Sequence, residues 1–348
     1  MYESTAFIII FFNMHLENNL SKKILAWYNN NRRLLPWRVS KKSQKKLYYR
    51  LLSEFMLQQT QVKTVLPYFK NFLRHFPDLK SLSRSNERKV LKLWEGLGYY
   101  RRARNLLATV KILIKEHDSK LPNKIIDIKK LPGIGDYTAN ALAAFIHDQP
   151  TIAIDGNVKR VFSRIMNKSE NKIDFNKLIE TNKKSLFKIK RHSDFVEALM
   201  EFGALICKPK EPACFKCTLK NTCKYFKSDK KFKPIKRIKQ QEKNYNIFCY
   251  IDKIKNNIAL TKKHNSGFLN NFYLPTIKET TLKKKIKNWN FHSNFKESIS
   301  NKKLNINLYY KFSVKIPLQS QWYSLKENNE FIPSFTKKIF RKILDINL

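Results

Sequence analysis

The spacing of apolar residues predicts helices over most of this chain. Apolar positions recur with the helical period from Leu20 to Tyr28, from Tyr99 to Ile114 and from Ala139 to Ile146. Further helices are expected from about Tyr48 to Leu73, from about Asn86, from Val158 to Met166 and from His192 to Ile206. Strand signals are absent before about residue 244. The chain up to that point is therefore expected to be all-α.

The pattern changes after a lysine-rich stretch. Short strand candidates follow at Asn246–Ile251, Asn257–Leu260 and Leu304–Ile316, and Phe335–Leu344 reads as a closing amphipathic helix. We expect an α+β multidomain protein, with an all-α region over 17–226, a basic linker over 227–243 and a small α+β domain over 244–348. A length of 348 residues is enough for two domains.

The charge of the chain favours a polyanion as partner. Lys and Arg number 70 against 27 Asp and Glu, which gives a net charge of +43. Lys, Asn and Ile are abundant throughout while Gly is scarce, as expected of a coding sequence that has drifted towards A and T. Part of the charge therefore has a compositional origin, and its size alone does not establish DNA binding.

The first residues do not read as part of the fold. The apolar run Ala6–Phe12 is too short to span a bilayer, which takes about 20 residues. It also lacks the basic start and the small-residue cleavage site of a secretory signal. Residues 1–16 are expected to be disordered or a mis-assigned start, with Met14 as an alternative initiator. The expected location is the cytoplasm.

A glycine turn precedes the helix from Ala139. Gly133 and Gly135 lie in Leu131-Pro132-Gly133-Ile134-Gly135, in a chain with only 7 glycines. Pro132 fixes its own backbone angle, and the glycines accept conformations that are closed to other residues. Such a turn at a helix N-terminus directs several N–H groups at one point, where a phosphate oxygen binds well. The alternative is a capping turn between two core helices.

A carboxylate lies in an apolar part of the helix expected from Tyr48. Glu54 is surrounded in sequence by Leu51, Leu52, Phe55 and Met56. Burial there would be costly unless the carboxyl has a partner or a raised pKa; a solvent-facing Glu is the alternative. The run Gln58-Gln59-Thr60-Gln61 is unusual inside a helix, unless the helix ends in a polar turn.

Four cysteines form a compact group. Cys207, Cys214, Cys217 and Cys223 have the spacing C-x6-C-x2-C-x5-C, whereas Cys249 lies apart. In a cytoplasmic chain this grouping favours a metal over disulfides. Zinc usually takes two C-x2-4-C knuckles and only one short pair is present, so four thiolates holding a [4Fe–4S] cluster are the preferred interpretation.

Taken in order, these motifs resemble the adenine DNA glycosylases of the endonuclease III superfamily. The resemblance covers nearly the whole chain from about Leu20. Its motifs are Leu35-Pro36-Trp37-Arg38, Ser53 to Gln61, Leu93 to Tyr100, the glycine turn, Asp155-Gly156-Asn157-Val158-Lys159-Arg160 and the cysteine loop.

The resemblance implies a function for each motif. Such enzymes flip adenine out of a mispair with 8-oxoguanine or guanine and cleave its glycosidic bond. Glu54 corresponds to the proton donor and Asp155 to the carboxylate that stabilises the sugar cation, with Tyr137 and Asn157 in support. Trp37, Arg38 and Glu197 correspond to contacts with the extruded adenine. Gln59, Thr60, Leu97 and Tyr99 correspond to residues that fill the duplex, and Gly133, Ile134 and Gly135 to contacts with the DNA backbone.

The same resemblance bears on strand cleavage and on the second domain. Relatives that cut the strand through a Schiff base carry Lys where this chain has Tyr137, so a monofunctional glycosylase is expected. We also expect the protein to be a monomer. Alternatives are a glycosylase/lyase for oxidised pyrimidines and a DNA-binding relative that has lost catalysis. The C-terminal domain resembles a Nudix-like reader of the opposite base. Its Phe-Ser-His loop is not intact, with Phe312–Val314 and Tyr309–Lys311 as possible counterparts.

Overall fold

A computed structural model describes residues 16–17, 19–231, 241–281, 286–299, 302–326 and 331–345. The atypical start expected over 1–16 thus lies outside the described residues except for Leu16. The chain divides into two compact units, the first made of 1–84 with 105–236 and the second of 85–104 with 237–348. Within the described residues, no helix is long and apolar enough to cross a membrane.

Unit 1 is helical, as the sequence predicted. Between its first helix and residue 231 the described residues contain no strand. The helices are α2 (Leu20–Asn31), α3 (Lys46–Leu57), α4 (Val62–His75), α5 (Leu79–Ser83), α7 (Arg101–Glu116, shared with unit 2 at its start), α8 (Ile125–Ile128), α9 (Asp136–His147), α10 (Gly156–Met166), α11 (Phe175–Thr181), α12 (Lys183–Leu186), α13 (His192–Leu205) and α14 (Lys224–Lys227), with 3-10 turns at Glu170–Lys172 and Cys214–Lys216.

The single helix expected from Tyr48 to Leu73 is wrong. The chain forms α3 and α4, which are separated by residues 58–61. Gln58, the cap residue directly after α3, has a ψ of 110°, and Gln59 has a φ of +61°, in the left-handed region that side chains rarely adopt. The run of glutamines therefore forms the polar turn that its composition allowed.

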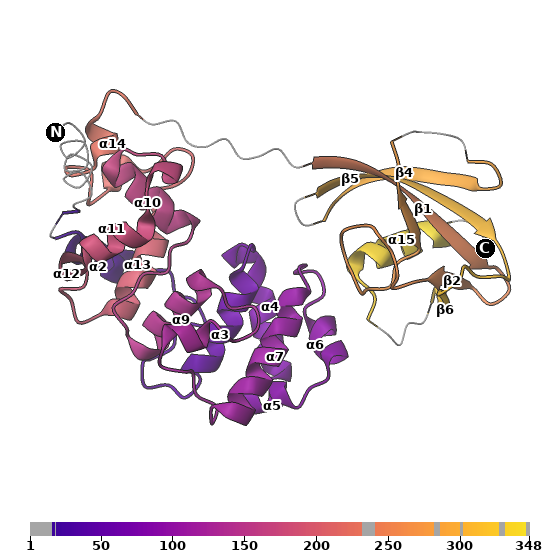
Figure 1. The fold of residues 1–348 in the computed structure, drawn as a ribbon, viewed down its shortest axis with the longest axis horizontal. Coiled ribbons are helices and arrows are strands. Elements are labelled where there is room, and N and C mark those ends of the chain that lie inside the picture. The colour runs from indigo at the N-terminus through magenta and orange to yellow at the C-terminus, as the bar shows by residue number, and fades with distance from the viewer. Residues whose placement is uncertain are drawn as a thin grey trace, which may run out of the picture. The chain divides into compact units, whose positions relative to one another are not determined.

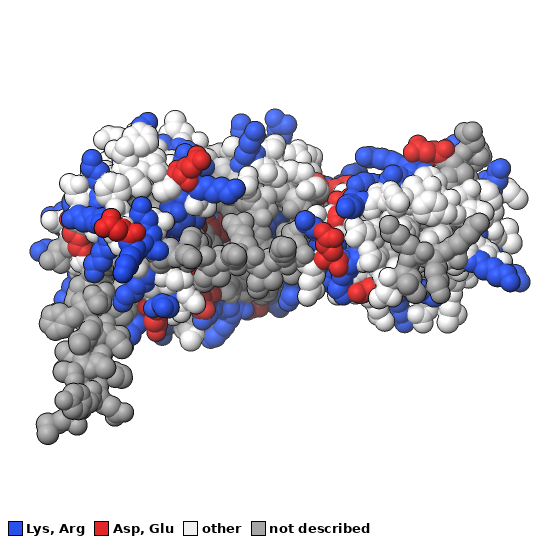
Figure 2. Space-filling view, turned by 90° about the horizontal axis from the view of Figure 1, so that it is seen from above, with Lys and Arg blue, Asp and Glu red and all other residues white. Residues whose placement is uncertain are grey.

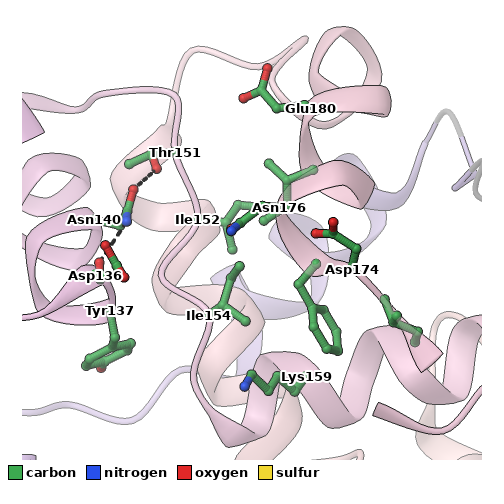
Figure 3. Close-up of a pocket in the computed structure, with 13 residues that line it drawn as sticks. Asp136, Tyr137, Asn140, Thr151, Ile152, Ile154, Lys159, Asp174, Asn176 and Glu180 are labelled. Carbon is green, nitrogen blue, oxygen red and sulfur yellow. Dashed lines mark hydrogen bonds between the residues drawn. The ribbon is translucent and has the colours of Figure 1, made fainter. Parts of the chain in front are cut away.

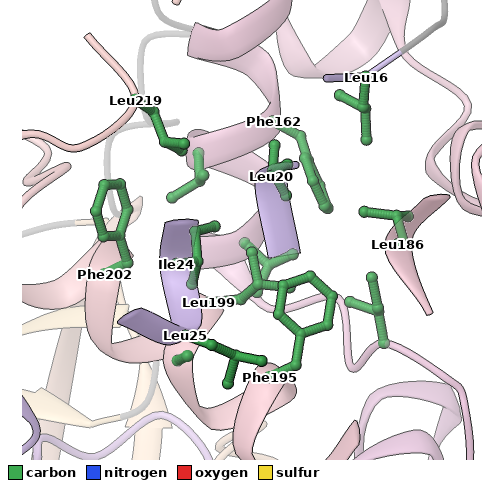
Figure 4. Packing of buried hydrophobic residues seen from close by; sticks show 14 of the residues in the cluster. Leu16, Leu20, Ile24, Leu25, Phe162, Leu186, Phe195, Leu199, Phe202 and Leu219 are labelled. Carbon is green, nitrogen blue, oxygen red and sulfur yellow. The ribbon is translucent and has the colours of Figure 1, made fainter. Parts of the chain in front are cut away.

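Two groups of helices make up unit 1 (Figure 1). One group contains α3, α4 and α9. The other contains α2, α10, α11, α12 and α13, whose apolar side chains form one core (Figure 4). A smaller core joins the two groups: alanines and Phe145 of α9 pack with Ala153, which precedes α10, and with Val196 of α13. Because alanine side chains are short, α9 can lie close to α13, and this brings residues from both groups to one place.

Unit 2 contains a mixed sheet with a helix against one face. The strands are β1 (Gln241–Asp252), β2 (Asn257–Leu260), β3 (Thr276–Glu279), β4 (Asn290–Ile299), β5 (Lys302–Phe312) and β6 (Gln321–Ser324). Their order is β4-β5-β1-β2-β6, with β3 also paired to β1. β1 and β5 run parallel, and the other pairs are antiparallel. Apolar residues of α15 (Ser334–Leu344) pack on the core of this sheet, and the short helix α6 (Glu87–Leu93) also belongs to unit 2. The α+β fold class is confirmed.

Candidate active site

Glu54 lies inside unit 1 rather than on its surface. It is 5% exposed on α3, and the neighbouring residues Leu52, Phe55 and Met56 are completely buried. Burial raises the pKa of the Glu54 carboxyl to about 7, although a hydrogen bond with the Tyr137 phenol and the charge of Arg50 act in the opposite direction. Its Oε2 atom is buried without a hydrogen-bond partner among the described residues. At neutral pH this carboxyl can therefore carry a proton and present it to a bound group.

The glycine turn places Tyr137 beside Glu54. Gly133 has a φ of +77°, and the Thr109 hydroxyl donates to the Pro132 carbonyl at 2.9 Å. Gly133 thus uses a conformation that favours glycine, whereas Gly135 has a φ of −93° and caps α9. Burial, together with the Glu54 and Asp155 carboxylates, raises the pKa of Tyr137 well above its usual value. Tyr137 therefore stays a neutral phenol.

The polar turn after α3 contacts this glycine turn. The Gln58 side-chain amide donates to the Gly133 carbonyl at 3.3 Å and to the Thr138 hydroxyl at 3.4 Å. Gln59 is exposed beside it, and Thr60 closes the turn through its N–H to the Leu57 carbonyl at 3.1 Å. The Gln58 side chain therefore fixes the two turns to each other. The sequence analysis did not assign a role to this residue.

Asp155 caps the N-terminus of α10. Its Oδ1 accepts from the Val158 N–H at 2.7 Å and its Oδ2 from the Asn157 amide at 2.8 Å. Burial raises the pKa of Asp155, and these hydrogen bonds oppose that rise. The Arg160 guanidinium in turn donates to the Asn157 side-chain oxygen and to the Gly203 and Cys207 carbonyls, each at 2.7 Å. Asp155 thus accepts hydrogen bonds at the start of α10. Arg160 of the same helix connects this site with the cysteine loop, because it binds the Cys207 carbonyl.

Glu197 of α13 is the centre of a buried charge network. It is 4% exposed, accepts a hydrogen bond from the Tyr28 hydroxyl, and forms ion pairs with Arg50 and, at 2.9 Å, with the Nε of Arg38. Burial opposes the positive charge of Arg38, but Glu197, Tyr28 and Glu201 outweigh it and raise the Arg38 pKa. Glu201 lies one helical turn after Glu197 and also binds Arg33.

The remaining predicted contact residues lie in different surroundings. Trp37 is buried with its ring edge on Phe69, at 5.2 Å between centroids. Leu97 and Tyr99 belong to unit 2; Leu97 is buried, whereas Tyr99 is 40% exposed with a φ of +49°. The structure therefore brings five of the predicted site residues into unit 1: Glu54, Tyr137, Asp155, Asn157 and Glu197. Leu97 and Tyr99 lie in the other unit, and their position relative to these five residues is not defined.

A pocket of about 530 Å³ opens next to Tyr137 (Figure 3). Its walls are the start of α9, the segment before α10, and α11. Its lining is largely polar and comprises Asp136, Tyr137, Asn140, Thr151, Ile152, Ile154, Lys159, Ile173, Asp174, Phe175, Asn176, Ile179 and Glu180. Asn140 accepts from the Thr151 hydroxyl and donates to the Asp136 carbonyl at 2.7 Å. The lining therefore offers hydrogen-bonding groups to a ligand beside Tyr137, whereas Glu54, Asp155 and Asn157 do not line this pocket.

The four predicted cysteines surround a second, small cavity of about 30 Å³. None is in a disulfide, and Arg164 donates to the Cys207 sulfur at 3.4 Å. Burial raises the pKa of Cys207, Cys217 and Cys223, with Cys217 at about 11. As they stand, no three His, Cys, Asp or Glu side chains of the described chain are close enough to form a metal-binding group. Four free thiols around one cavity nevertheless suit a metal cluster held by thiolates, and the guanidinium at their edge would offset the negative charge of those thiolates.

Comparison with known proteins decides the family. Adenine DNA glycosylase of Buchnera aphidicola subsp. Baizongia pistaciae is 36% identical over 346 residues, which cover 93% of this chain and 96% of the relative. The enzyme of the same name from Buchnera aphidicola subsp. Schizaphis graminum is 42% identical over 63% of each chain. The chain belongs to the adenine DNA glycosylase family. It is a hydrolase, and the resemblance inferred from the motifs is confirmed.

Two further comparisons agree with this membership of the adenine DNA glycosylase family. Residues 52–185 match the profile of the HhH-GPD superfamily base excision DNA repair proteins. The fold is similar to the solved structure of a thermostable thymine-DNA glycosylase, with 26% identity, a TM-score of 0.53, and coverage of 60% of this chain and 95% of that one. The chain is thus a DNA glycosylase with a helix–hairpin–helix core.

Several residues of the site were not found by sequence reasoning. Arg50, Tyr28 and the pair Arg33–Glu201 all contact Glu197 or its partners. The sequence spacing could have pointed to two of them. Arg50 precedes Glu54 by four residues and Glu201 follows Glu197 by four, so each pair shares one face of its helix. Tyr28 had no such signal, because it lies 169 residues from Glu197 in sequence.

Proposed function

We propose that this enzyme removes adenine that is mispaired with 8-oxoguanine or guanine in double-stranded DNA. The observation that carries the proposal is the Glu54 carboxyl, which is buried, has a pKa of about 7 and lies beside Tyr137 and Asp155. Adenine is a poor leaving group unless its ring is protonated, and a carboxylic acid with a raised pKa supplies that proton at neutral pH. The names of the curated relatives support the same base.

The proposed reaction is hydrolysis after base flipping. Glu54 donates a proton to the ring of the extruded adenine, and the bond between the ring nitrogen and C1′ breaks with its electrons leaving on the base. The sugar becomes an oxocarbenium-like cation, which the Asp155 carboxylate stabilises. Water then adds to C1′, and the proton that it loses passes to the Glu54 carboxylate, which restores the acid. The amide of Asn157 supports this role because it keeps the Asp155 carboxylate in one orientation.

Tyr137 supports a monofunctional enzyme. Strand cleavage needs an amine that forms an imine with C1′, and a phenol cannot form one. The raised pKa of Tyr137 also makes it a poor nucleophile at neutral pH. A glycosylase/lyase for oxidised pyrimidines is the weaker alternative, because no lysine takes this position. Loss of catalysis is disfavoured by the intact arrangement of Glu54, Tyr137 and Asp155.

Contacts with DNA are proposed at three places. Gly133, Ile134 and Gly135 would contact a backbone phosphate, with the N–H groups of Gly133 and Gly135 as donors, because the Ile134 N–H already donates to the Leu131 carbonyl at 3.2 Å. No heavy atom outside the turn lies within 4 Å of where a Gly135 Cβ would be, which leaves that backbone approachable. Trp37, Arg38 and Glu197 would surround the extruded adenine. Gln59, Thr60, Leu97 and Tyr99 would enter the duplex. The charge alone does not mark the DNA surface, because Lys and Arg side chains are spread widely over the face seen in Figure 2.

Cys207, Cys214, Cys217 and Cys223 would hold a [4Fe–4S] cluster. When bound, such a group ties together the loop after α13, whose small cavity and free thiols suit it. The catalytic steps above do not depend on it. Because four closely spaced thiols stay reduced in the cytoplasm, that location remains our expectation.

The second domain is proposed to read the base opposite adenine. We retain the expected division into 17–226 and 244–348, in a monomer. Of the two possible loop counterparts, Tyr309–Lys311 lies within β5, whereas Ser313 and Val314 follow its end. Phe312 and Val314 are exposed there, and the Ser313 hydroxyl donates to the Lys315 carbonyl at 2.7 Å. This favours Phe312–Val314 as the reading loop, without the usual His.

The test is a single-turnover assay with adenine opposite 8-oxoguanine, guanine and thymine in otherwise identical duplexes. We expect release from the first two and little from the third, with an intact abasic strand. Equal release from all three would contradict the mispair specificity, and no release from any would contradict the proposed substrate.

A further inference from the structure

A buried arginine lies one helical turn before the candidate acid. Arg50 is 7% exposed on α3, and Glu54 follows it by four residues, so the two side chains share one face of the helix. A cation so close to a general acid is unexpected, because it favours the ionised carboxylate and so removes the proton that the acid must donate. Arg50 indeed acts to lower the pKa of Glu54.

The charge of Arg50 is paired with Glu197 of α13. The two side chains form a close ion pair, and both are almost completely buried. On its other side the Arg50 guanidinium lies over the ring of Phe145, at 4.7 Å from the centroid. Charges buried in this way keep their mutual attraction because little water screens them. Arg50 is therefore fixed between α9 and α13.

We propose that Arg50 and Glu197 act as one compensated pair, in which Glu197 cancels the field of Arg50 at the Glu54 carboxyl and Arg50 holds Glu197 in place through their ion pair. Arg50 is on this account a positioning residue. The inference rests on the proposed function, since it concerns the acid of that reaction.

The groups around Glu54 are consistent with this arrangement. Tyr137 of α9 and Arg50 of α3 favour the ionised carboxylate, whereas Asp155, which caps α10, and Glu197 of α13 favour the protonated acid. Arg50 and Glu197 thus act on Glu54 in opposite directions. Removing either partner alone should therefore shift the pKa of Glu54, and removing both should bring that pKa back towards its wild-type position.

Glu197 has enough other partners to survive the loss of Arg50. The Tyr28 hydroxyl and the Nε of Arg38 both bind its Oε2 atom, and Arg38 is held in turn by Glu201 at 3.1 Å. An Arg50→Met variant therefore leaves Glu197 paired. In Glu197→Gln the amide can still accept the Tyr28 hydrogen bond, but the compensating charge is lost.

The experiment measures the midpoint of Glu54 ionisation in Arg50→Met, Glu197→Gln and the double variant. The readout is the infrared C=O stretch of a protonated carboxyl, assigned to Glu54 by its absence in Glu54→Gln; single-turnover adenine release is measured over the same pH range. In Glu197→Gln we expect the midpoint and the alkaline limb of the rate to move down by about one pH unit, a roughly tenfold loss of rate above the midpoint. In Arg50→Met both should move up, and in the double variant both should return close to wild type.

Two matched variants control for loss of packing. Arg50→Lys keeps the charge and should keep the wild-type midpoint. Arg33→Met removes a cation that binds Glu201 rather than Glu197, and should also leave the midpoint in place. An unchanged midpoint in both single variants, or shifts in the same direction, would overturn the proposal. Absence of adenine release with a normally shifting infrared band would instead contradict the proposed function alone.

Discussion

Gly203 and Asn157 are in contact so close that position 203 has no room for a side chain. A Cβ atom at Gly203 would lie 2.7 Å from the Cβ of Asn157 and 3.0 Å from its carbonyl oxygen. The backbone of α13 therefore limits the position of Asn157. The side-chain amide of Asn157 in turn donates a hydrogen bond to the Asp155 carboxylate. The position of the catalytic carboxylate thus depends on a glycine in another helix.

Gly203→Ala should accordingly damage both stability and activity. The added methyl group must push Asn157 and the start of α10 away, and overpacking of this kind costs about 1–3 kcal/mol of unfolding free energy. Urea unfolding and single-turnover base release measure the two effects. Gly156→Ala is the matched control for stability, since nothing lies within 4 Å of its added Cβ. Equal unfolding free energies for the two variants would contradict the explanation.

Glu54→Gln should abolish adenine release and leave duplex binding largely intact. Loss of a general acid lowers the rate by about 10²–10⁴-fold. In the wild type, the rate should fall as pH rises through about 7, because only the protonated carboxyl is an acid. Base release by this variant at the wild-type rate would remove Glu54 from the mechanism.

The same carboxyl should make stability depend on pH. Its pKa is higher in the folded state than in the unfolded chain, so the folded state binds more protons between about pH 4.5 and 7. Stability from this group is present at low pH and falls as pH rises, by at most about 1.4 kcal/mol per pH unit. Glu54→Gln should flatten this dependence in unfolding experiments at pH 5, 6 and 7. A slope as steep as that of the wild type would show that other groups cause it.

Tyr137→Lys should gain a borohydride-trappable complex with DNA that contains the target base. The wild type should release adenine and leave a strand that breaks only after alkali. Tyr137→Phe serves as the control, because it removes the hydroxyl without supplying an amine. Efficient strand scission by the wild type, at the rate of base release, would refute the monofunctional assignment.

Replacing Cys214 or Cys217 by Ser should give poorly folded protein with little iron. Wild-type protein purified without oxygen should be brown and contain about four irons per chain. The comparison variant is Cys249→Ser, a cysteine buried in unit 2 and remote from the loop in sequence, which should keep its iron. Stoichiometric zinc in place of iron would overturn the cluster.

Sequence reasoning found the residues that belong to local motifs and missed those that depend on tertiary contact. Glu54, Asp155 and the cysteines lie in short recognisable patterns, whereas Arg50 acquires its meaning from Glu197 on a distant helix. The strand β3 (Thr276–Glu279) was missed because Ile277 is its one apolar residue, whereas β2 has the same length but three apolar residues. The strand β4 was missed because its alternation is largely polar and exposed. The break after Leu57 was predictable from composition, but its left-handed Gln59 was not.

The packing of α2 against α13 affects how the enzyme is made. The Leu16 N–H donates to the Asn182 side chain at 2.7 Å, across 166 residues of sequence, and the core of α2 closes only on later helices. At about 5–20 residues per second, a ribosome needs roughly 10–30 s to synthesise that interval. During translation the helices from α3 to α9 are complete before α2 has its partners. The apolar face of α2, the first helix that the structure describes, therefore stays uncovered during that time and is accessible to a chaperone that binds nascent chains.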